Sequence, residues 1–592
     1  MSDTTDLARV ARGTLWSPTD ADPAVILAAD ELAHYVGRLT GITPARATVP
    51  GDGAHLWLGP NRPERSVTLA GEAAIEASAE AIALTGTTPR ATLAAVYRLL
   101  AAAGCRWSPR GVAHEDIPRD TALPVRSSIH RPAFARRAYA SDLTTWHYTM
   151  PERFASRLPQ DLAFIDWMAK TGATGWLFIR HAHDDRWLLP ELVPALRTRG
   201  LAVEWGGHGL VEWLPRDAFA AHPEYFPQHA AGDRTDMGNC CTDNTDGLAL
   251  IRAGVRQARA AAGSDDLHLW GLDLFGGGWC HCPGCRTLTP SDQALRLANA
   301  VADDLSHGER VFHLAYHDTL PPPRTVSPHP RVWAEFAPRE RCYAHAIDDP
   351  ACHANPRYRA ALEAHLACFD GRVEVFEYYA DTILFGGCAV PLVEVIARDL
   401  DYYQRVGVQG VSCLTFGRFS HLAHGANLTA FAAGTHDPRT TRAGAHDHCR
   451  DAFGPAATLS EQYFRILERA IAPVLTWGDV KLPPRTAATA TALAQAVATR
   501  TQLEEALRKL PASPRADAER RLFHYTLGTL DGLRRLCPPG HDADAVLATL
   551  QELAASFHDV DVDHAGTWGT VDLPITHSFY AASLRQPDPP VS

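Results

Sequence analysis

One stretch of the chain, residues 267–286, gathers residue types that can do chemistry. It begins with an apolar run typical of a buried strand, carries one carboxylate, Asp273, and then breaks into three glycines and a Cys-x-Cys-x-x-Cys cluster. A strand that ends in an acid and a glycine-rich loop is typical of the catalytic face of an α/β barrel, because strand carboxyl ends converge there. The alternative for a lone Asp is that it caps the next turn.

Two further carboxylates end apolar runs of strand type, Glu335 and the Glu377 of VEVFEYYAD. Hydrolysis of a glycosidic bond needs two acidic functions, one on each side of that bond. We therefore name Asp273, Glu335 and Glu377 as candidate catalytic residues, with Asp273 or Glu335 as the acid/base and Glu377 as the nucleophile or stabiliser. Strand alternation predicts that Glu377 reaches the barrel mouth. The alternative is a salt bridge to Arg339 or Arg341.

Aromatic and polar residues cluster near the ends of the same runs. Aromatic faces pack against the C–H surfaces of sugars, and polar groups recognise their hydroxyls. A carbohydrate pocket is favoured over a nucleotide site, since the sequence contains no Walker or dinucleotide fingerprint. The candidate substrate-binding residues are Trp205, His208, Trp279, Tyr316, His317, Asp318, Arg339, Tyr378, Tyr379 and Asp381.

The cysteine cluster suggests a metal site. Three thiolates, from Cys280, Cys282 and Cys285, together with Cys241 from the Cys-Cys pair at 240–241, would give a tetrahedral four-cysteine zinc site. The spacing is not that of a standard zinc ribbon, and reduced cysteines in a tight loop are the alternative. We predict a structural zinc here and no cofactor in the chemistry itself.

Composition narrows the class of protein. The chain has 592 residues, enough for two or three domains, and a net charge of −12. This charge, with no long basic run, argues against nucleic-acid and membrane-surface partners and fits a soluble enzyme with a neutral substrate. The expected partner is a small carbohydrate substrate, and a homodimer stays open. Thirteen cysteines, an N-terminus without a signal-peptide pattern and no long apolar stretch predict a cytoplasmic protein.

The elements that must position these residues follow an α/β pattern. We expect a small N-terminal α/β domain at 1–125, a catalytic (β/α)₈ barrel at 126–436 and a C-terminal helical domain at 437–592, in which apolar residues recur at helical spacing. The barrel is predicted from eight strand-like runs with helix-length segments between them: 136–140, 175–180, 201–206, 267–275, 310–316, 331–336, 372–379 and 410–416.

Several motifs carry a family resemblance. The helix AVYRLL ending in GCRW resembles the N-terminal domain of α-glucuronidases and β-hexosaminidase-like glycosidases. The segment 206–469 resembles glycoside hydrolase family 163 and its wider relatives, the domain-of-unknown-function family 4838. The matching pieces are GHGL (207–210), AHPEYFP (221–227), the GGGWCHCPGC loop, VFHLAYHDTLPPP (311–323) and FGPAATLSEQYF (453–464).

The resemblance implies a retaining glycosidase, and in family 163 an endo-acting β-N-acetylglucosaminidase. The chain departs from that pattern where Leu272 precedes Asp273 in place of an Asn-Asp pair, and where 412–418 lacks an acid. We therefore predict a β-N-acetylhexosaminidase-like retaining enzyme that acts on a small imported glycan or glycoside. Two alternatives stay open: an α-glucuronidase-like inverting hydrolase, with Arg180, Arg339 or Arg418 as the uronate ligand, and a non-catalytic carbohydrate-binding protein.

Overall fold

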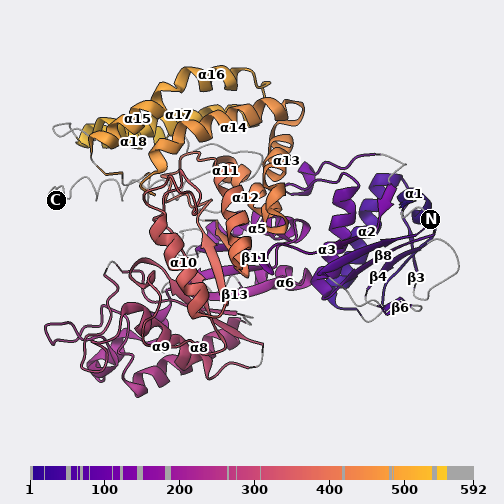
Figure 1. Ribbon diagram of the computed structural model, residues 1–592. Coiled ribbons are helices and arrows are strands. Elements are labelled where there is room, and N and C mark those ends of the chain that lie inside the picture. Colours follow the sequence, from indigo (N-terminus) through magenta and orange to yellow (C-terminus); the bar gives the residue numbers. More distant parts are fainter. Residues whose placement is uncertain are drawn as a thin grey trace. The chain divides into compact units, whose positions relative to one another are not determined.

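The computed structural model describes most of the chain between residues 4 and 555 (Figure 1). The chain forms two compact units, Met1–Ala133 with Leu158–Gly175 and Pro190–Ala202, and Phe134–Arg157 with Trp176–Leu189 and Val203–Ser592. Within 4–555, the description omits residues 19–20, 48–54, 60, 63–64, 67–70, 79, 110, 120–123, 143–150, 181–188, 263–265, 275, 307, 416–420, 479, 481–482, 485 and 537–542.

The first unit holds a six-stranded sheet in the order β10-β7-β8-β4-β2-β3. Its two long helices, α2 (Pro23–Thr40) and α3 (Pro89–Ala102), each begin with a proline behind a capping Asp22 or Thr88, as the sequence pattern indicates. The strands are β2 (Thr14–Trp16), β3 (Ala45–Ala47), β4 (His55–Leu58), β7 (Ala73–Ala77), β8 (Ala81–Gly86) and β10 (Ser128–His130), and smaller elements are β1 (Thr4–Asp6), α1 (Leu7–Ala11), β5 (Asn61–Arg62), β6 (Arg65–Ser66), η1 (Val112–His114) and β9 (Pro124–Arg126).

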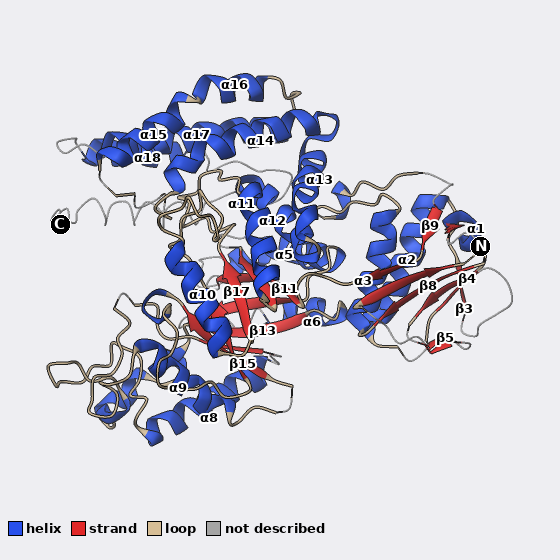
Figure 2. Ribbon diagram, viewed as in Figure 1, coloured by secondary structure: helices blue, strands red, loops and turns tan. Residues whose placement is uncertain are grey.

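Eight strands close into a barrel, which confirms the predicted (β/α)₈ fold (Figure 2). The last strand pairs in parallel with the first, so no edge is left open. The side chains on both faces of these strands are buried and mainly apolar, as expected for a parallel barrel. The strands are β11 (Arg136–Asp142), β12 (Gly175–Arg180), β13 (Ala202–Gly207), β14 (Asp266–Leu269), β15 (Arg310–Ala315), β16 (Val332–Phe336), β17 (Val373–Glu377) and β18 (Gly410–Leu414).

Helices and short turns connect the barrel strands. Strand β14 ends at Leu269, earlier than the run 267–275 predicts. The N–H of Trp270 still reaches Gly207 of β13 at 3.3 Å, but that of Leu272 donates to Asn239 Oδ1 at 2.8 Å. Asp273 therefore lies in a loop. The connecting elements are α5 (Pro151–Lys170), α6 (Leu189–Thr198), α7 (Leu210–Trp213), η3 (Arg216–Ala220), η4 (Pro223–Tyr225), α8 (Thr245–Ala262), α9 (Pro290–Ala302), η5 (His317–Thr319), α10 (Pro356–Cys368), α11 (Val393–Val406) and α12 (His421–His436).

The chain after the barrel is helical, as predicted. Hydrogen bonds join it to the loop after β17: for example, Tyr525 donates to the carbonyl of Gly386 at 2.8 Å, and Ala389 N–H donates to Thr526 at 3.0 Å. Among the described helices, none combines the length and apolarity that crossing a membrane requires. These helices are η6 (Pro438–Thr440), α13 (Thr441–Phe453), η7 (Gly454–Ala456), α14 (Ala457–Ile471), η8 (Ala472–Leu475), α15 (Ala487–Ala498), α16 (Arg500–Arg508), α17 (Pro514–Leu536) and α18 (Ala543–Ala555).

A chain of buried charges crosses the barrel lumen. Arg136 of β11 donates to Glu204 of β13 and to Glu374 of β17, in the latter case at 2.8 Å. Arg310 of β15 also donates to Glu374, at 3.1 Å. Because these residues come from strands that are not neighbours in the barrel, their side chains must meet inside it.

His268 of β14 extends this chain of charges. Its Nε2 lies 3.0 Å from Glu204 and its Nδ1 lies 2.8 Å from Glu335 of β16. Burial alone would lower the pKa of His268, but Glu335 and Glu204 more than offset that effect and raise the pKa to about 9. The ring is therefore a cation at neutral pH and donates to both carboxylates.

The first prediction concerns the pH dependence of stability. Because the folded-state pKa of His268 lies above its unfolded value, the stabilisation is complete below about pH 6.5 and is lost as pH rises through about 9. The unfolding free energy of the wild type should exceed that of His268→Gln by on the order of 3 kcal/mol near pH 6. Urea unfolding from pH 6 to 10 should show this difference shrinking, and a constant difference would contradict the charged state of His268.

Candidate active site at the carboxyl ends of the barrel strands

His317 stands between two carboxylates beyond the strand ends. Its Nε2 lies 3.8 Å from Asp273 Oδ1, and its Nδ1 lies 2.7 Å from Glu340 Oε1. Asp273 follows β14, His317 follows β15, and Glu340 follows β16. The side chains of Asp273 and Glu340 are 47% and 36% exposed, so both acids remain accessible to a bound molecule.

The backbone of His317 is strained. Its φ of +49° lies in the left-handed region, which side chains other than glycine rarely adopt and which costs about 1–3 kcal/mol. Thr319 holds the turn, because its hydroxyl donates to the carbonyls of Leu314 and Tyr316 and accepts the N–H of Tyr316. Strain of this kind clusters at functional sites.

Asp318, the next residue, is fixed by the glycine-rich loop. Its Oδ2 accepts a hydrogen bond of 2.6 Å from the indole N–H of Trp279. Gly277, with φ +70°, permits this approach, since a Cβ at that position would collide with both Asp318 and Trp279. Burial raises the pKa of Asp318, and the Trp279 bond only partly opposes the shift.

A cation lies on the same face of the barrel. Arg339 binds Asp381 with Nη2–Oδ2 and Nε–Oδ2 distances of 3.1 and 3.2 Å, and its guanidinium lies 5.8 Å from the ring centre of Tyr378. Asp381 Oδ1 is held in turn by the N–H groups of Ile383 and Leu384. The loops after β16 and β17 are thereby joined by a charged pair.

His208 completes the group. Its Nδ1 lies 2.6 Å from the carbonyl of Gly271, and its ring lies 5.0 Å from that of Trp270 and 6.4 Å from that of Tyr316. The strand ends thus bring together nine of the predicted site residues: Asp273, His208, Trp279, Tyr316, His317, Asp318, Arg339, Tyr378 and Asp381.

Glu335 points into the lumen and is fully buried. One of its oxygens, Oε2, bonds His268 and accepts the indole N–H of Trp270 at 3.1 Å, while Oε1 has no hydrogen-bond partner among the described residues. Glu335 and both of its partners, His268 and Trp270, are buried, whereas Asp273 and Glu340 are accessible. The placement suits a structural role in the charge chain.

Glu377 does not reach the barrel mouth, contrary to the alternation argument. Glu374 and Phe376 are the residues of β17 that face the lumen, where Phe376 packs against Trp270. The side chain of Glu377 points to the opposite face of the strand. It accepts a 2.5 Å hydrogen bond from Tyr403 of α11 and lies 3.4 Å from Arg341. The side chains do alternate along the strand, but the apolar residues on the same side as Glu377 pack against helices and do not line the mouth.

Two predicted sugar-contacting aromatics are buried against other elements and do not face the site. Tyr379 is fully buried and donates to Asp399 of α11 at 2.9 Å. Trp205 is 1% exposed and follows the lumen-facing Glu204, so it faces the helix layer, where it packs against Phe178. Conversely, sequence reasoning missed Glu340. Its only signal was its place beside Arg339, four residues after a strand end.

The four predicted metal-binding cysteines do come together. The sulfur atoms of Cys241, Cys280, Cys282 and Cys285 all lie within 4.8 Å of one another, and all four residues are buried. The N–H groups of Gln228 and Cys282 donate to Cys280 Sγ at 3.4 and 3.5 Å, as N–H groups do around bound thiolates. Four convergent soft donors of this kind fit a tetrahedral zinc ion.

The second prediction separates the two roles of Glu377. Burial raises its pKa to about 7 although Arg341 opposes the shift, and Arg341 keeps Asp399 as a second partner. Glu377→Gln should therefore cost about 1–3 kcal/mol in unfolding free energy. Asp399→Asn should cost about 3–5 kcal/mol, because it removes the main partner of a buried cation.

Urea unfolding and steady-state kinetics on both variants provide the check, with turnover of the folded Glu377→Gln protein expected at the wild-type level. If turnover by this variant instead falls by about 100-fold or more while its stability stays at the wild-type level, Glu377 takes part in the chemistry.

The fold of this protein is similar to that of several solved structures. A GH138 enzyme targeting pectin rhamnogalacturonan II aligns with a TM-score of 0.58 and 10% identity over 96% of this chain and 99% of that chain. A GH115 4-O-methyl-α-glucuronidase with specificity for decorated arabinogalactans aligns with a TM-score of 0.61 and 10% identity over 95% of this chain and 79% of that chain. At this identity, both likenesses show the fold alone.

A β-hexosaminidase from Streptomyces plicatus aligns less well, with a TM-score of 0.44 and 15% identity over 76% of this chain and 90% of that chain. No curated protein matches the sequence. The model of the family described as "Domain of unknown function (DUF4838)" matches residues 115–464, while the finer likeness to family 163 stays a prediction. Because that model covers more than half of the chain, the protein belongs to the DUF4838 family.

Proposed function

We propose that this protein is a glycosidase that hydrolyses a small glycan or glycoside at the carboxyl ends of its barrel strands. The observation that carries the proposal is the convergence of Asp273 and Glu340 on His317, at the end where barrel enzymes place their chemistry. Two accessible carboxylates are the chemical requirement for cleaving a glycosidic bond. The glycoside hydrolase neighbours support the reaction class as structural analogues.

In this proposal Asp273 protonates the leaving oxygen and Glu340 is the second carboxylate, in the role that the sequence pattern assigned to Glu377. His317 contacts Glu340 through Nδ1 at 2.7 Å and places its Nε2 3.8 Å from Asp273, so the ring lies beside both acids. Asp318, held by Trp279, accepts a sugar hydroxyl. The aromatic faces of Tyr316 and Tyr378, beside these groups, suit the C–H faces of a pyranose.

A specific observation favours a second substrate class, the α-glucuronides. Arg339 presents a guanidinium at the strand ends, where Asp381 holds it from one side and Tyr378 lies beside it. A uronate is a carboxylate that binds such a group in bidentate fashion. We therefore propose α-glucuronides as a second candidate substrate class, in addition to the β-N-acetylhexosaminides that the family 163 resemblance implies.

We also propose a cytoplasmic location and, with it, an imported substrate. None of the twelve cysteines in the described part of the chain forms a disulfide, although eleven of them are buried. Proteins of oxidising compartments tend to pair their cysteines, so this usage supports a reducing compartment.

The third prediction tests the reaction. A panel of aryl glycosides, including β-N-acetylhexosaminides and α-glucuronides, should contain at least one substrate of the wild type. Asp273→Asn and Glu340→Gln should each lower kcat/KM on it by on the order of 10³-fold, because each removes a group that donates a proton or carries charge in the transition state. The proton NMR spectrum of the first-formed sugar gives the anomer and hence the stereochemical outcome.

The matched control is Asp370→Asn. Asp370 has an 84% exposed side chain at the turn before β17, away from the strand carboxyl ends, and asparagine tolerates its left-handed φ of +50°. It should keep wild-type kinetics. Sugar binding without turnover of any glycoside in the panel would reject the proposed glycosidase activity and favour a carbohydrate-binding protein. Unchanged kinetics in both acid variants would reject Asp273 and Glu340 as the catalytic carboxylates.

We propose in addition that Cys241, Cys280, Cys282 and Cys285 hold a structural zinc ion. Arg234, whose pKa the nearby Cys241, Cys280 and Cys282 raise against the effect of burial, supplies a positive charge beside the thiolates. The ion would join the loop 238–243 to the loop after β14, which carries Trp279 and ends in the cysteines. It would thereby fix the indole that holds Asp318.

The fourth prediction follows from this site. Cys285→Ser should lose one equivalent of zinc per chain, and its melting temperature should fall by several degrees, because metal binding contributes folding free energy. Elemental analysis of protein purified without chelator checks the metal, with Cys413→Ser, a buried cysteine outside the cluster, as the control. Equal zinc content in both variants and the wild type would reject the site.

A further inference from the structure

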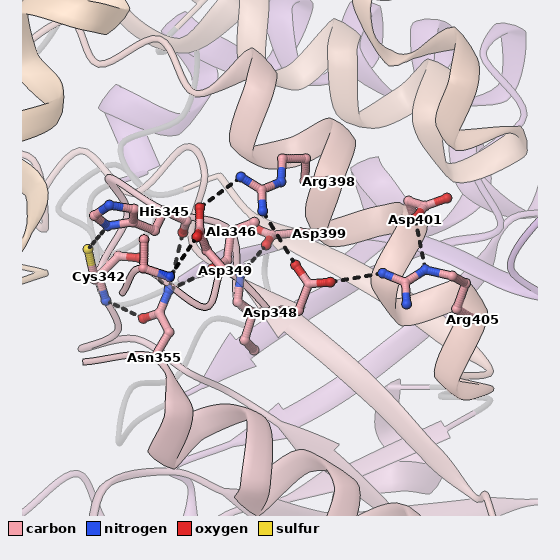
Figure 3. Close-up of polar contacts among 12 residues, drawn as sticks. Cys342, His345, Ala346, Asp348, Asp349, Asn355, Arg398, Asp399, Asp401 and Arg405 are labelled. Carbon is pink, nitrogen blue, oxygen red and sulfur yellow. Dashed lines mark hydrogen bonds and ion pairs between the residues drawn. The ribbon is translucent and has the colours of Figure 1, made fainter. Parts of the chain in front are cut away.

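A second group of soft donors lies in the loop after β16, apart from the four-cysteine cluster. Cys342, His345 and Cys352 each offer one ligand atom, and the three atoms lie within 4.8 Å of one another. Cys342 Sγ and His345 Nδ1 are 3.2 Å apart (Figure 3). The two cysteines are 1% and 4% exposed, whereas His345 is only half-buried.

Asn355 holds this loop in place from inside. Its Oδ1 accepts the N–H of Cys342 at 2.8 Å, and its Nδ2 donates to the carbonyls of Cys342, His345 and Ala346 at 3.0 to 3.2 Å (Figure 3). Its own N–H donates to Cys352 Sγ at 3.3 Å. One fully buried residue therefore contacts all three donor residues, so the donors are positioned before any ligand arrives.

Helix α11 anchors the same loop from the other side. Asp399 accepts the N–H of Ile347 at 2.7 Å, and Arg398 donates to Asp349 at 2.8 Å (Figure 3). These bonds tie the segment between His345 and Cys352 to a regular helix. A preformed cluster lowers the ordering cost of binding, because the chain does not have to rearrange around the ligand.

The donor chemistry points to a metal ion. Two thiols and an imidazole nitrogen are a ligand set that zinc accepts, with Zn–S distances of about 2.3 Å and Zn–N distances of about 2.0 Å. Donor atoms around a tetrahedral ion of this size lie roughly 3.3–3.8 Å apart, and the Cys342–His345 separation is close to that range.

We propose that Cys342, His345 and Cys352 form a second zinc site, with three protein ligands and a fourth position open to water. The open position follows from the half-buried His345, which places one side of the cluster near solvent. Sites with three protein ligands leave room for an exchangeable ligand, unlike closed four-cysteine sites. The ion would clasp the loop that also carries Arg339 and Glu340, the cation and the second carboxylate of the proposed active site.

The fifth prediction uses zinc itself as the probe and counts equivalents in the full-length chain. Protein stripped by chelator is reloaded with excess Zn²⁺, desalted and measured by elemental analysis. His345→Ala and Cys352→Ser should each hold one zinc fewer than the wild type. Cys368→Ser, which changes a half-buried cysteine of α10 outside the cluster, should hold as much as the wild type. The difference does not depend on the four-cysteine site or on activity.

Two measurements keep the result clear. The metal-free His345→Ala protein should have the same melting temperature as the metal-free wild type, since the ring is half-buried and a metal is its main proposed partner. After reloading with Co²⁺, the wild type minus His345→Ala difference spectrum should contain thiolate-to-cobalt charge transfer bands. Equal zinc content in all four proteins, an empty difference spectrum, or a Cys342–Cys352 disulfide in the isolated protein by peptide mapping would overturn the site.

Discussion

The chain of charges across the barrel lumen is the constraint on which the rest of the structure depends. Buried charges are costly unless each is paired, and removing one partner leaves the other stranded. Arg136 satisfies Glu204 and Glu374, while His268 satisfies Glu204 and Glu335. Because these pairs join β11, β13, β14, β16 and β17, a shift in the register of any one strand would break at least one pair. The network therefore fixes which residues stand at the strand ends.

Above this network, the site is built from strained and closely packed loops. His317 adopts its left-handed conformation between Asp273 and Glu340, and Gly277 allows Trp279 to reach Asp318. The left-handed backbone of His317 costs free energy, and position 277 accepts no residue larger than glycine. Neither feature adds to the packing of the core. Their place at the carboxyl ends of the strands is consistent with selection for binding and chemistry.

Much of the fold was predictable from the sequence, because parallel barrel strands appear as apolar runs and their helices have helical periodicity. Asp273, His317 and Asp318 were also predictable, since Asp273 lies within the apolar run 267–275 and the other two come just after the run 310–316. The pattern misled for Glu377, because a barrel strand is buried on both faces, so apolar neighbours do not reveal which face lines the lumen. Glu340 was missed because a loop residue four positions past a strand has no periodicity to mark it. The second donor cluster was missed because Cys342, His345 and Cys352 are joined by the loop path that Asn355 organises, which spacing alone does not indicate.

The central claim is that a sugar binds against the exposed carboxylates of Asp273 and Glu340, beside the His317 ring that lies between them. A crystal structure of Asp273→Asn with its best aryl glycoside tests this most directly, because the variant should bind substrate without turning it over. The proposal predicts the glycosidic oxygen within hydrogen-bond distance of residue 273, the Glu340 carboxylate on the opposite side of the bond, and the sugar ring against Tyr316 or Tyr378. A glycoside bound elsewhere in the molecule, or bound here with Glu340 out of reach of the anomeric carbon and of any water beside it, would contradict the proposal.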